Sequence, residues 1–193
     1  MPDMRQHIRE SNAIEGIHDP AEVDRSLKAW EWLMEHDRLT HDVVCGVQKR
    51  ITWAQNDLAM NQIGFYRSVS KVNVRVGPHV PPRWDQVDDL MDGWLAELDD
   101  FSPWDNHVRF ETIHCFTDGN GRTGRALLWW DEIRRGQQPT LIKASERFNY
   151  YDALQHGRPL NRDEYVRALL GVFADKDDDL EWAAMNRWRI HRG

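Results

Sequence analysis

The chain has 193 residues, of which 40% are hydrophobic and 30% charged, and its formal net charge is −7. Such a length and balance are typical of a single soluble domain that buries a sizeable core. The negative charge argues against non-specific nucleic-acid binding, which needs a basic surface, and no apolar run is long enough to span a membrane. We therefore expect no nucleic acid and no membrane among the partners.

The cysteine content and the N-terminus bear on the compartment. Cys45 and Cys115 are the only cysteines, and Cys115 follows a histidine, so a structural disulfide is not expected. The N-terminal stretch MPDMRQHIRE lacks the apolar segment of a secretory signal. These features favour a cytoplasmic protein.

Apolar side chains recur at helical spacing along most of the chain. One stripe follows Pro20, which suits the first turn of a helix, and the next follows Thr40, which suits an N-cap. A third stripe follows Pro81-Pro82. Further helices are expected over about residues 106–113, up to about Gly136, and at 145–155, 163–173 and 180–190. The sequence therefore predicts an all-α bundle.

One stretch departs from the helical pattern. Residues 70–77, which read SKVNVRVG, alternate apolar and polar side chains. A period of two residues is typical of a strand with one buried face. We therefore expect a strand that begins at Ser70.

The most informative stretch begins at His114, ends at Arg125 and reads HCFTDGNGRTGR. Histidine titrates near neutral pH, so His114 can accept a proton in a reaction. Gly119 and Gly121 let the backbone turn sharply and direct bare N–H groups toward an anion. Because residues 125–130 favour a helix, these N–H groups are expected at a helix N-terminus, where phosphate binds well.

Charged side chains complete this stretch. Arg122 and Arg125 are three residues apart, so they share a helix face, and their guanidinium groups suit phosphate oxygens. Asp118 is a suitable ligand for Mg²⁺, which binds through one or two carboxylates together with phosphates. The spacing of a Walker loop is absent. The residues therefore predict transfer of a phosphate-containing group.

The same stretch resembles the signature of the Fic family, H-x-F-x-[DE]-G-N-G-R-x-x-R. All eight specified positions match, namely His114, Phe116, Asp118, Gly119, Asn120, Gly121, Arg122 and Arg125. Cys115 stands where many members carry proline, at a position without a catalytic group. The resemblance implies an all-α, Fic-type helical bundle with a small β-hairpin flap over the active site, and a single Fic domain over residues 1–193.

The resemblance also implies the activity of a protein adenylyltransferase, which transfers AMP from ATP to a Ser, Thr or Tyr hydroxyl of a target protein. In this reading His114 takes the proton of the hydroxyl, and Asp118 holds Mg²⁺ against the α- and β-phosphates. Asn120 and the loop amides hold the α-phosphate oxygens, while Arg122 neutralises the β-phosphate and Arg125 the γ-phosphate. Doc kinases, which transfer a γ-phosphate, carry lysine in place of the second glycine of the signature, so Gly121 favours AMP transfer.

Two further segments resemble parts of Fic proteins. Residues 64–82 resemble the flap, where Val72, Asn73 and Val74 could hold an extended target peptide through backbone hydrogen bonds. The alternative is a small hairpin that braces the bundle. Tyr150 and Tyr151 resemble residues that line the adenine pocket, although a tyrosine pair is also common in a core.

The N-terminal residues 1–18 contain a second resemblance. The run from Ser11 to Gly16 matches [ST]-x-x-x-E-[GN], an autoinhibitory motif of many Fic proteins. Ser11 and Glu15 are four residues apart and share a helix face, and Gly16 suits the end of that helix. An ion pair between Glu15 and Arg125 would occupy the γ-phosphate seat. The alternative is a surface serine and glutamate on a terminal helix.

Other outcomes stay open at this stage. A Fic enzyme could transfer phosphate, use another nucleotide donor, or remove AMP with Glu15 aligning a water molecule. A non-catalytic binding module of the toxin–antitoxin kind is a third class. The segment 180–193 has no assigned role, and its Trp182 and Trp188 could form a subunit contact in a homo-oligomer.

Overall fold

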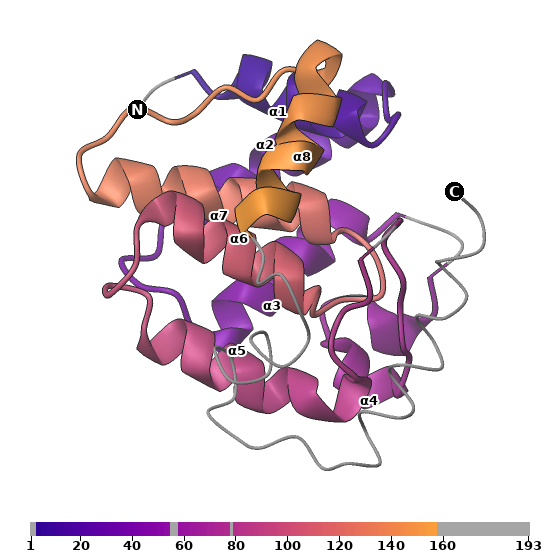
Figure 1. Cartoon of the computed structure of the whole chain (residues 1–193). Helices are drawn as coiled ribbons and strands as arrows, with labels where there is room; N and C mark the ends of the chain where they lie inside the picture. The colour runs from indigo at the N-terminus through magenta and orange to yellow at the C-terminus, as the bar shows by residue number, and fades with distance from the viewer. Residues whose placement is uncertain (1–2, 55–57, 78, 158–193) are drawn as a thin grey trace.

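The computed structural model describes residues 3–54, 58–77 and 79–157 (Figure 1). Within these ranges the chain forms eight α-helices and three short 3₁₀ turns, with no β-strand, which confirms the all-α prediction. The helices predicted at residues 163–173 and 180–190, and the segment 180–193, lie outside the described residues. The helices are α1 (Arg5–Ile14), α2 (Pro20–Leu33), α3 (His41–Thr52), α4 (Arg67–Ser70), α5 (Val87–Ala96), α6 (Pro103–Ile113), α7 (Asn120–Arg134) and α8 (Arg147–Gly157).

The helix boundaries follow local signals in the sequence. Asp19 caps α2 by accepting a hydrogen bond of 2.9 Å from the Ala21 amide, and Pro20 occupies the first turn. Thr40 caps α3 through the Val43 amide, as predicted. Gly136 adopts a left-handed conformation just after α7, which confirms the predicted end of that helix.

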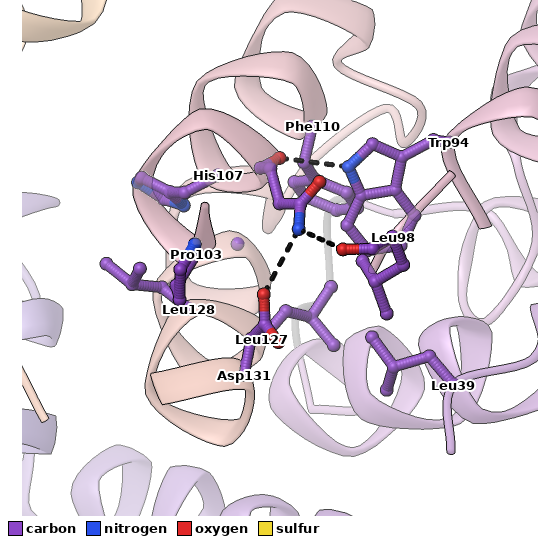
Figure 2. Close-up of a pocket in the computed structure, with 11 residues that line it drawn as sticks. Leu39, Trp94, Leu98, Pro103, His107, Phe110, Leu127, Leu128 and Asp131 are labelled. Carbon is purple, nitrogen blue, oxygen red and sulfur yellow. Dashed lines mark hydrogen bonds between the residues drawn. The ribbon is translucent and has the colours of Figure 1, made fainter. Parts of the chain in front are cut away.

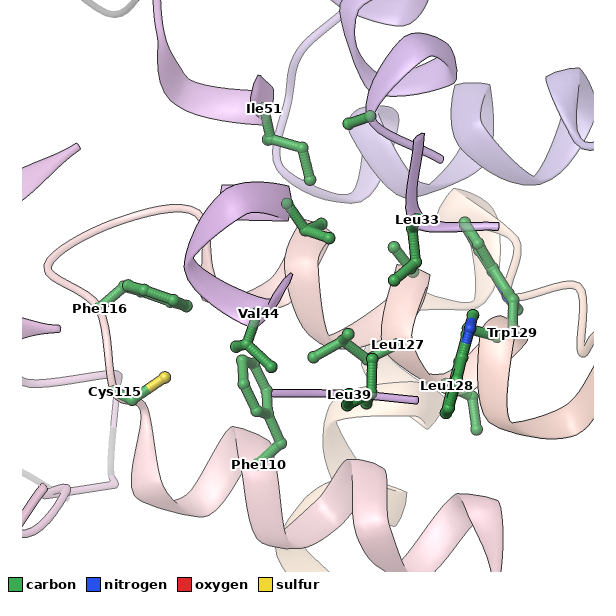
Figure 3. Packing of buried hydrophobic residues seen from close by; sticks show 14 of the residues in the cluster. Leu33, Leu39, Val44, Ile51, Phe110, Cys115, Phe116, Leu127, Leu128 and Trp129 are labelled. Carbon is green, nitrogen blue, oxygen red and sulfur yellow. The ribbon is translucent and has the colours of Figure 1, made fainter. Parts of the chain in front are cut away.

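Helix α7 forms the centre of the molecule. Leu127 points into the core toward Val44 of α3 and Phe110 of α6 (Figure 3). Leu128 is buried beside it, and Trp129 packs edge-on against Trp30 of α2. In Figure 1, α1, α2 and α8 lie on one side of α6 and α7, and α4 and α5 lie on the other. A helix buried on nearly all sides cannot shift without disturbing the whole core, so the loop that precedes α7 is held firmly.

A buried polar network fixes α6 against its neighbours. The Asn106 side-chain amide donates to the Leu98 carbonyl at 2.7 Å and to Asp131 at 3.1 Å, and the Trp94 indole donates to the Asn106 carbonyl at 2.9 Å. Figure 2 shows Trp94, Leu98 and Asp131 converging on this point. Because a buried polar group without a partner is costly, the network locks α5, α6 and α7 in one register.

None of the described helices is long and apolar enough to cross a membrane.

The flap segment, residues 64–82, differs from the predicted strand. Ser70 ends α4, and Lys71 follows in a left-handed conformation with φ 55°, so the prediction that a strand begins at Ser70 is wrong. Beyond it the chain is joined by one antiparallel bridge, in which the Val76 amide donates to the His79 carbonyl at 3.0 Å and the His79 amide to the Val76 carbonyl at 2.8 Å. The segment turns like a hairpin, but among the described residues it lacks the ladder that a strand requires.

Candidate active site

The signature loop, residues 114–125, runs from the end of α6 into the first turns of α7. His114 ends α6 in a left-handed conformation with φ 50°, and its amide still donates to the Phe110 carbonyl. Gly119 is the N-cap of α7 and has φ 79°, a conformation that is costly for a residue with a Cβ atom. Helix α7 begins at Asn120, so the loop leads into a helix N-terminus as the sequence predicts, and Arg122 already lies in the first turn of the helix.

Asn120 closes the loop with its side chain. Its Oδ1 accepts from the Phe116 amide at 2.9 Å, and its Nδ2 donates to the Phe116 carbonyl at 2.8 Å. Both ends of the side-chain amide are therefore used within the protein. The sequence analysis assigned Asn120 only to phosphate binding and did not predict this structural role.

Gln48 of α3 holds the loop through hydrogen bonds, a role that the sequence analysis did not predict. Its Nε2 donates to the Asp118 carbonyl at 3.1 Å, and its Oε1 accepts from the Gly64 amide at 2.6 Å. Gln48 is fully buried beside apolar residues of α3. A buried glutamine inside an apolar helix face was the available signal, because such a group needs internal partners.

Replacing Gly119 by alanine is expected to destabilise the protein by about 3 kcal/mol, because the left-handed conformation costs about 1–2 kcal/mol and overpacking about as much again. A Cβ atom at this position would lie 2.7 Å from Thr52 Cγ2. Thermal or urea unfolding measures the loss. Thr52→Ser removes that methyl group but keeps a hydroxyl for the Gln48 carbonyl. The double variant Gly119→Ala/Thr52→Ser is therefore expected to recover only the part of the lost unfolding free energy that comes from overpacking. Equal losses with and without Thr52→Ser would contradict the close contact.

His114 is held close to Glu111 and Arg67. Its side chain is 15% exposed, and Nδ1 lies 4.0 Å from the Glu111 carboxylate one helical turn earlier. Its carbonyl accepts a hydrogen bond of 2.9 Å from Arg67 Nε. Sequence analysis did not single out Glu111 or Arg67. The backbone of His114 is therefore held by Arg67, and its imidazole lies within ion-pair distance of the Glu111 carboxylate.

Arg67 is a buried clamp between α6 and the flap segment. Its guanidinium donates to the carbonyl oxygens of Ile113 and His114 at the end of α6, and to those of Val72 and Pro82 in the flap segment. One fully buried cation thus binds four carbonyl groups from two parts of the chain. The flap segment and the histidine are therefore held in a fixed relation.

Asp118 and Arg122 differ sharply in exposure. The Asp118 side chain is 48% exposed, and its carboxylate lies 3.6 Å from Arg122 Nη2, which is buried. Burial lowers the pKa of the Arg122 guanidinium, and the carboxylates of Asp118 and Glu15 oppose that shift. Arg122 Nε and Nη1 bond to no described residue. A buried cation with two unused donors can bind an anion.

Arg125 is engaged by the N-terminal helix. Its Nε donates to Ser11 Oγ at 2.7 Å, and its Nη2 donates to the Ser11 carbonyl at 3.0 Å and to Glu15 Oε1 at 2.7 Å. Burial alone would lower the pKa of Arg125, but the oxygens of Tyr150 and Glu15 raise it above its ordinary value. Helix α1 ends at Ile14, and Gly16 follows with φ 75°, in line with the predicted stop. Ser11 and Glu15 therefore meet the guanidinium from one side of α1.

Gly121 leaves the space in which Glu15 lies. A Cβ atom at this position would overlap Glu15 Oε1 and would lie 3.0 Å from Arg125 Nη1. The second glycine of the signature thus leaves room for the Glu15 carboxylate. The same small residue serves the loop and its contact with α1.

The two tyrosines of α8 lie in different environments. Tyr150 is buried, and its hydroxyl lies 2.9 Å from His107 Nε2 and accepts from Arg125 Nη1 at 3.4 Å. Tyr151 is half-exposed, and burial together with the nearby Glu15 raises the pKa of its hydroxyl. Tyr150 therefore braces Arg125, and Tyr151 offers an exposed ring beside it.

The thiols of Cys45 and Cys115 are expected to resist alkylation in the folded protein. Both cysteines are free, as predicted. Burial raises the pKa of Cys45 to about 12 and that of Cys115 well above its ordinary value, so the reactive thiolate is scarce at pH 8. Iodoacetamide followed by intact mass is expected to label neither thiol quickly until guanidinium is added. Fast labelling of Cys115 without denaturant would contradict the packing described for it.

Within the described residues the protein is all-α, and the signature loop leads into the N-terminus of a buried helix. Comparison with known proteins agrees. The Fic/DOC family matches residues 38–130, which include the flap segment and the signature loop but not Ser11, Glu15, Tyr150 or Tyr151. The chain therefore carries a domain of the Fic/DOC family.

Named relatives and solved structures fall in the same family. Protein adenylyltransferase Fic from Nematostella vectensis is 29% identical over 196 residues, covering 81% of this chain and 45% of the relative. The namesake from Culex quinquefasciatus is 36% identical over 122 residues, covering 58% of this chain and 24% of the relative. The chain thus spans less than half of these curated relatives.

Among solved structures, a Fic domain containing signaling protein from Bacteroides thetaiotaomicron superposes with a TM-score of 0.66 at 18% identity, covering 79% of this chain and 70% of that one. Fic-1 from C. elegans gives a TM-score of 0.63 at 22% identity, covering 81% and 56%. Both likenesses concern the fold, and they confirm the predicted Fic-type helical bundle.

Proposed function

We propose that the protein is a protein adenylyltransferase that transfers AMP from ATP to a Ser, Thr or Tyr hydroxyl of a target protein. The observation that carries the proposal is that one loop bears three groups: the imidazole of His114, the exposed carboxylate of Asp118, and the buried, incompletely bonded guanidinium of Arg122. The names of the relatives support the same activity.

In the proposed reaction His114 accepts the proton of the target hydroxyl while the hydroxyl oxygen attacks the α-phosphorus. The new bond joins that oxygen to the α-phosphorus, the bond to the β-phosphate oxygen breaks, and pyrophosphate leaves. Backbone N–H groups at the start of α7, including that of Asn120, would hold the α-phosphate oxygens as charge builds on them. Arg122 would neutralise the β-phosphate, and Arg125, once free, the γ-phosphate.

Asp118 suits Mg²⁺ because its carboxylate is 48% exposed and lies 3.6 Å from Arg122, the proposed partner of a phosphate. Within the described residues no group of three or more histidine, cysteine or acidic side chains could hold a metal ion by itself. This fits Mg²⁺, which binds through one carboxylate together with nucleotide phosphates and waters. The bound ion would supply positive charge to the phosphates of ATP.

Asp118→Ala is expected to remove most of the transfer activity, by about two orders of magnitude, because charge stabilisation at the phosphates is lost. The remaining activity is expected to be insensitive to Mg²⁺ concentration. Asp118→Asn, which keeps the shape but not the charge, provides the matched variant. Initial rates over a Mg²⁺ titration measure both effects, and an unchanged Mg²⁺ dependence in Asp118→Ala would remove the assignment of the ligand.

The proposal includes autoinhibition by residues 1–18. Glu15 and Ser11 bind Arg125, and Glu15 lies in the space beside Gly121. A carboxylate in that position would exclude a γ-phosphate by occupying its partner and by repelling its charge. ATP could then bind only in a pose unsuited to in-line attack.

A second outcome, removal of AMP from a modified target, is favoured by the same position of Glu15. Its carboxylate approaches the start of α7, where it could align a water molecule for attack on an AMP ester. Incubating an AMP-modified target with wild-type protein and with Glu15→Gly separates the two outcomes. Loss of AMP only with wild type would assign removal to this protein.

The proposed layout is a single Fic domain over residues 1–193, with residues 1–18 as the inhibitory helix, 64–82 as the flap and 114–125 as the active-site loop. Val72, Asn73 and Val74 of the flap would hold the target peptide, and Tyr150 and Tyr151 would border the adenine. Use of ATP and the two free thiols support a cytoplasmic location.

Intact-protein mass tests the proposed function. Wild type, Glu15→Gly and Glu15→Gly/His114→Ala are incubated with ATP and Mg²⁺, alone and with candidate targets. An added AMP with Glu15→Gly alone is the expected result. An added phosphate would instead favour a kinase, and ATP binding without turnover under any condition would favour a binding module.

A further inference from the structure

The flap segment has an exposed face of unusual charge. Residues 58–84 contain Arg67, Lys71, Arg75 and Arg83 but no aspartate or glutamate, in a chain with 32 acidic and 25 basic residues. Arg67 is buried, and Arg83 pairs with Asp85 at 2.9 Å. Lys71 and Arg75 are exposed and form no ion pair with any described residue. These two cations are therefore available to a partner.

The two cations are exposed on the same short stretch, with Lys71 in the left-handed turn after α4 and Arg75 four residues later. Exposure alternates along the segment, so that Lys71, Asn73 and Arg75 face solvent while Val72 and Val74 are half-buried. The Lys71 ammonium lies 5.6 Å from the centre of the Trp84 ring, which restrains it. Two acidic residues that follow the segment have other partners, since Asp85 binds Arg83 and Asp88 accepts from the Ser68 hydroxyl.

The backbone of the same residues is open to pairing. Within the described part of the chain, no backbone hydrogen bond uses the N–H or C=O groups of Asn73, Val74 or Arg75. Such an edge can bind an extended peptide by adding it as a strand. A polypeptide backbone matches these alternating donors and acceptors, and a nucleic-acid backbone does not.

The backbone of residues 73–75 also belongs to a segment that is tied to the end of α6 near His114. Arg67 bonds to Val72 and Pro82 of the flap segment and to the carbonyl of His114, and His79 Nε2 donates to the Thr112 carbonyl at 2.9 Å. A peptide paired with the edge would therefore lie at a fixed distance from the imidazole.

We propose that the flap segment selects target segments in which the modified hydroxyl residue is flanked by acidic side chains, with Lys71 and Arg75 binding the flanking carboxylates. This inference rests on the proposed function, because it names the class of target for the same site. Exposed charge pairs contribute modestly to affinity, but they discriminate strongly against like charge. The expected selectivity is therefore between acidic and basic flanks more than between acidic and neutral ones.

The test uses short synthetic peptides with one central threonine and identical spacing, flanked by glutamate, by glutamine or by lysine. Full-length Glu15→Gly is the reference enzyme, and the variant adds Lys71→Glu and Arg75→Glu. Lys28→Glu is the matched control, because Lys28 is an exposed lysine of α2 away from the site. Binding is measured by fluorescence anisotropy at low and high salt, and AMP transfer to each peptide by mass.

The glutamate-flanked peptide is expected to bind most tightly, with the difference shrinking at high salt. The double reversal is expected to weaken that binding by about tenfold and to favour the lysine-flanked peptide, while Lys28→Glu changes neither value. Equal binding of the three peptides, or a preference unmoved by the reversal, would overturn the inference. So would a reversal that weakens binding of a single-stranded oligonucleotide and leaves the peptides unaffected.

The two readouts separate this inference from the proposed function. Charge-dependent binding without AMP transfer would support the docking surface and count against the transferase. Equal transfer to all three peptides would support the transferase and overturn the charge selection.

Discussion

Replacing Glu15 by glycine is expected to raise the rate of AMP transfer at least about tenfold, because it releases a charge-assisted hydrogen bond of the kind that contributes about 1.5–3 kcal/mol. Glu15 Oε1 lies 2.7 Å from Arg125 Nη2, but the Glu15 side chain is 34% exposed, so the lower end of that range applies. Glycine at this position follows the last residue of α1, where it does little harm to the helix. The measurement is the initial rate of AMP incorporation at saturating ATP.

Two companion variants separate charge from shape. Glu15→Gln keeps a hydrogen-bond acceptor for Arg125 but loses the charge, so it is expected to activate less than Glu15→Gly. Ser11→Ala removes one acceptor and leaves the Ser11 carbonyl in place, so a smaller activation is expected. If all three variants transfer AMP at the wild-type rate, the proposed inhibition by Ser11 and Glu15 is wrong. The affinity for ATP distinguishes a freed γ-phosphate seat from a general loosening of the N-terminus.

Most of the fold could be predicted because its determinants are local. Caps such as Thr40, the proline after Asp19 and the glycine at 136 mark helix ends through contacts within a few residues. The flap was the exception. Its alternation of exposed and half-buried side chains is real, but a strand also needs a partner backbone, and no side-chain pattern specifies one.

The candidate active-site groups lie within twelve consecutive residues, so the sequence could single them out, but it did not reveal the groups that support the loop. Gln48 and Arg67 act on the loop through backbone carbonyl oxygens, which every residue carries and which leave no mark in the sequence. Asn120 shows the converse. Its residue type suggested a phosphate ligand, but its side chain is bound to the Phe116 backbone. A motif thus indicates which residues a site requires, without separating those that touch the substrate from those that shape the loop.

His114→Ala is expected to lower AMP transfer by about 10²–10⁴-fold in the Glu15→Gly background, which is the usual contribution of a general base. The imidazole is the group that can accept the hydroxyl proton at the end of α6, and its 15% exposure leaves it reachable. ATP binding is expected to persist, because Arg122 and the α7 amides are untouched. The loss should therefore appear in kcat and not in the KM for ATP.

The left-handed conformation of His114, with φ 50°, complicates an alanine substitution, because alanine adopts it at a cost. Asparagine tolerates this conformation and cannot act as a base near neutral pH, so His114→Asn tests the chemistry with the loop preserved. Both variants should lose activity to the same extent if the imidazole is the base. Activity restored in His114→Asn would show that the loss in alanine came from a displaced loop, and the proton acceptor would then have to be sought elsewhere, with Glu111 the nearest carboxylate to the same position.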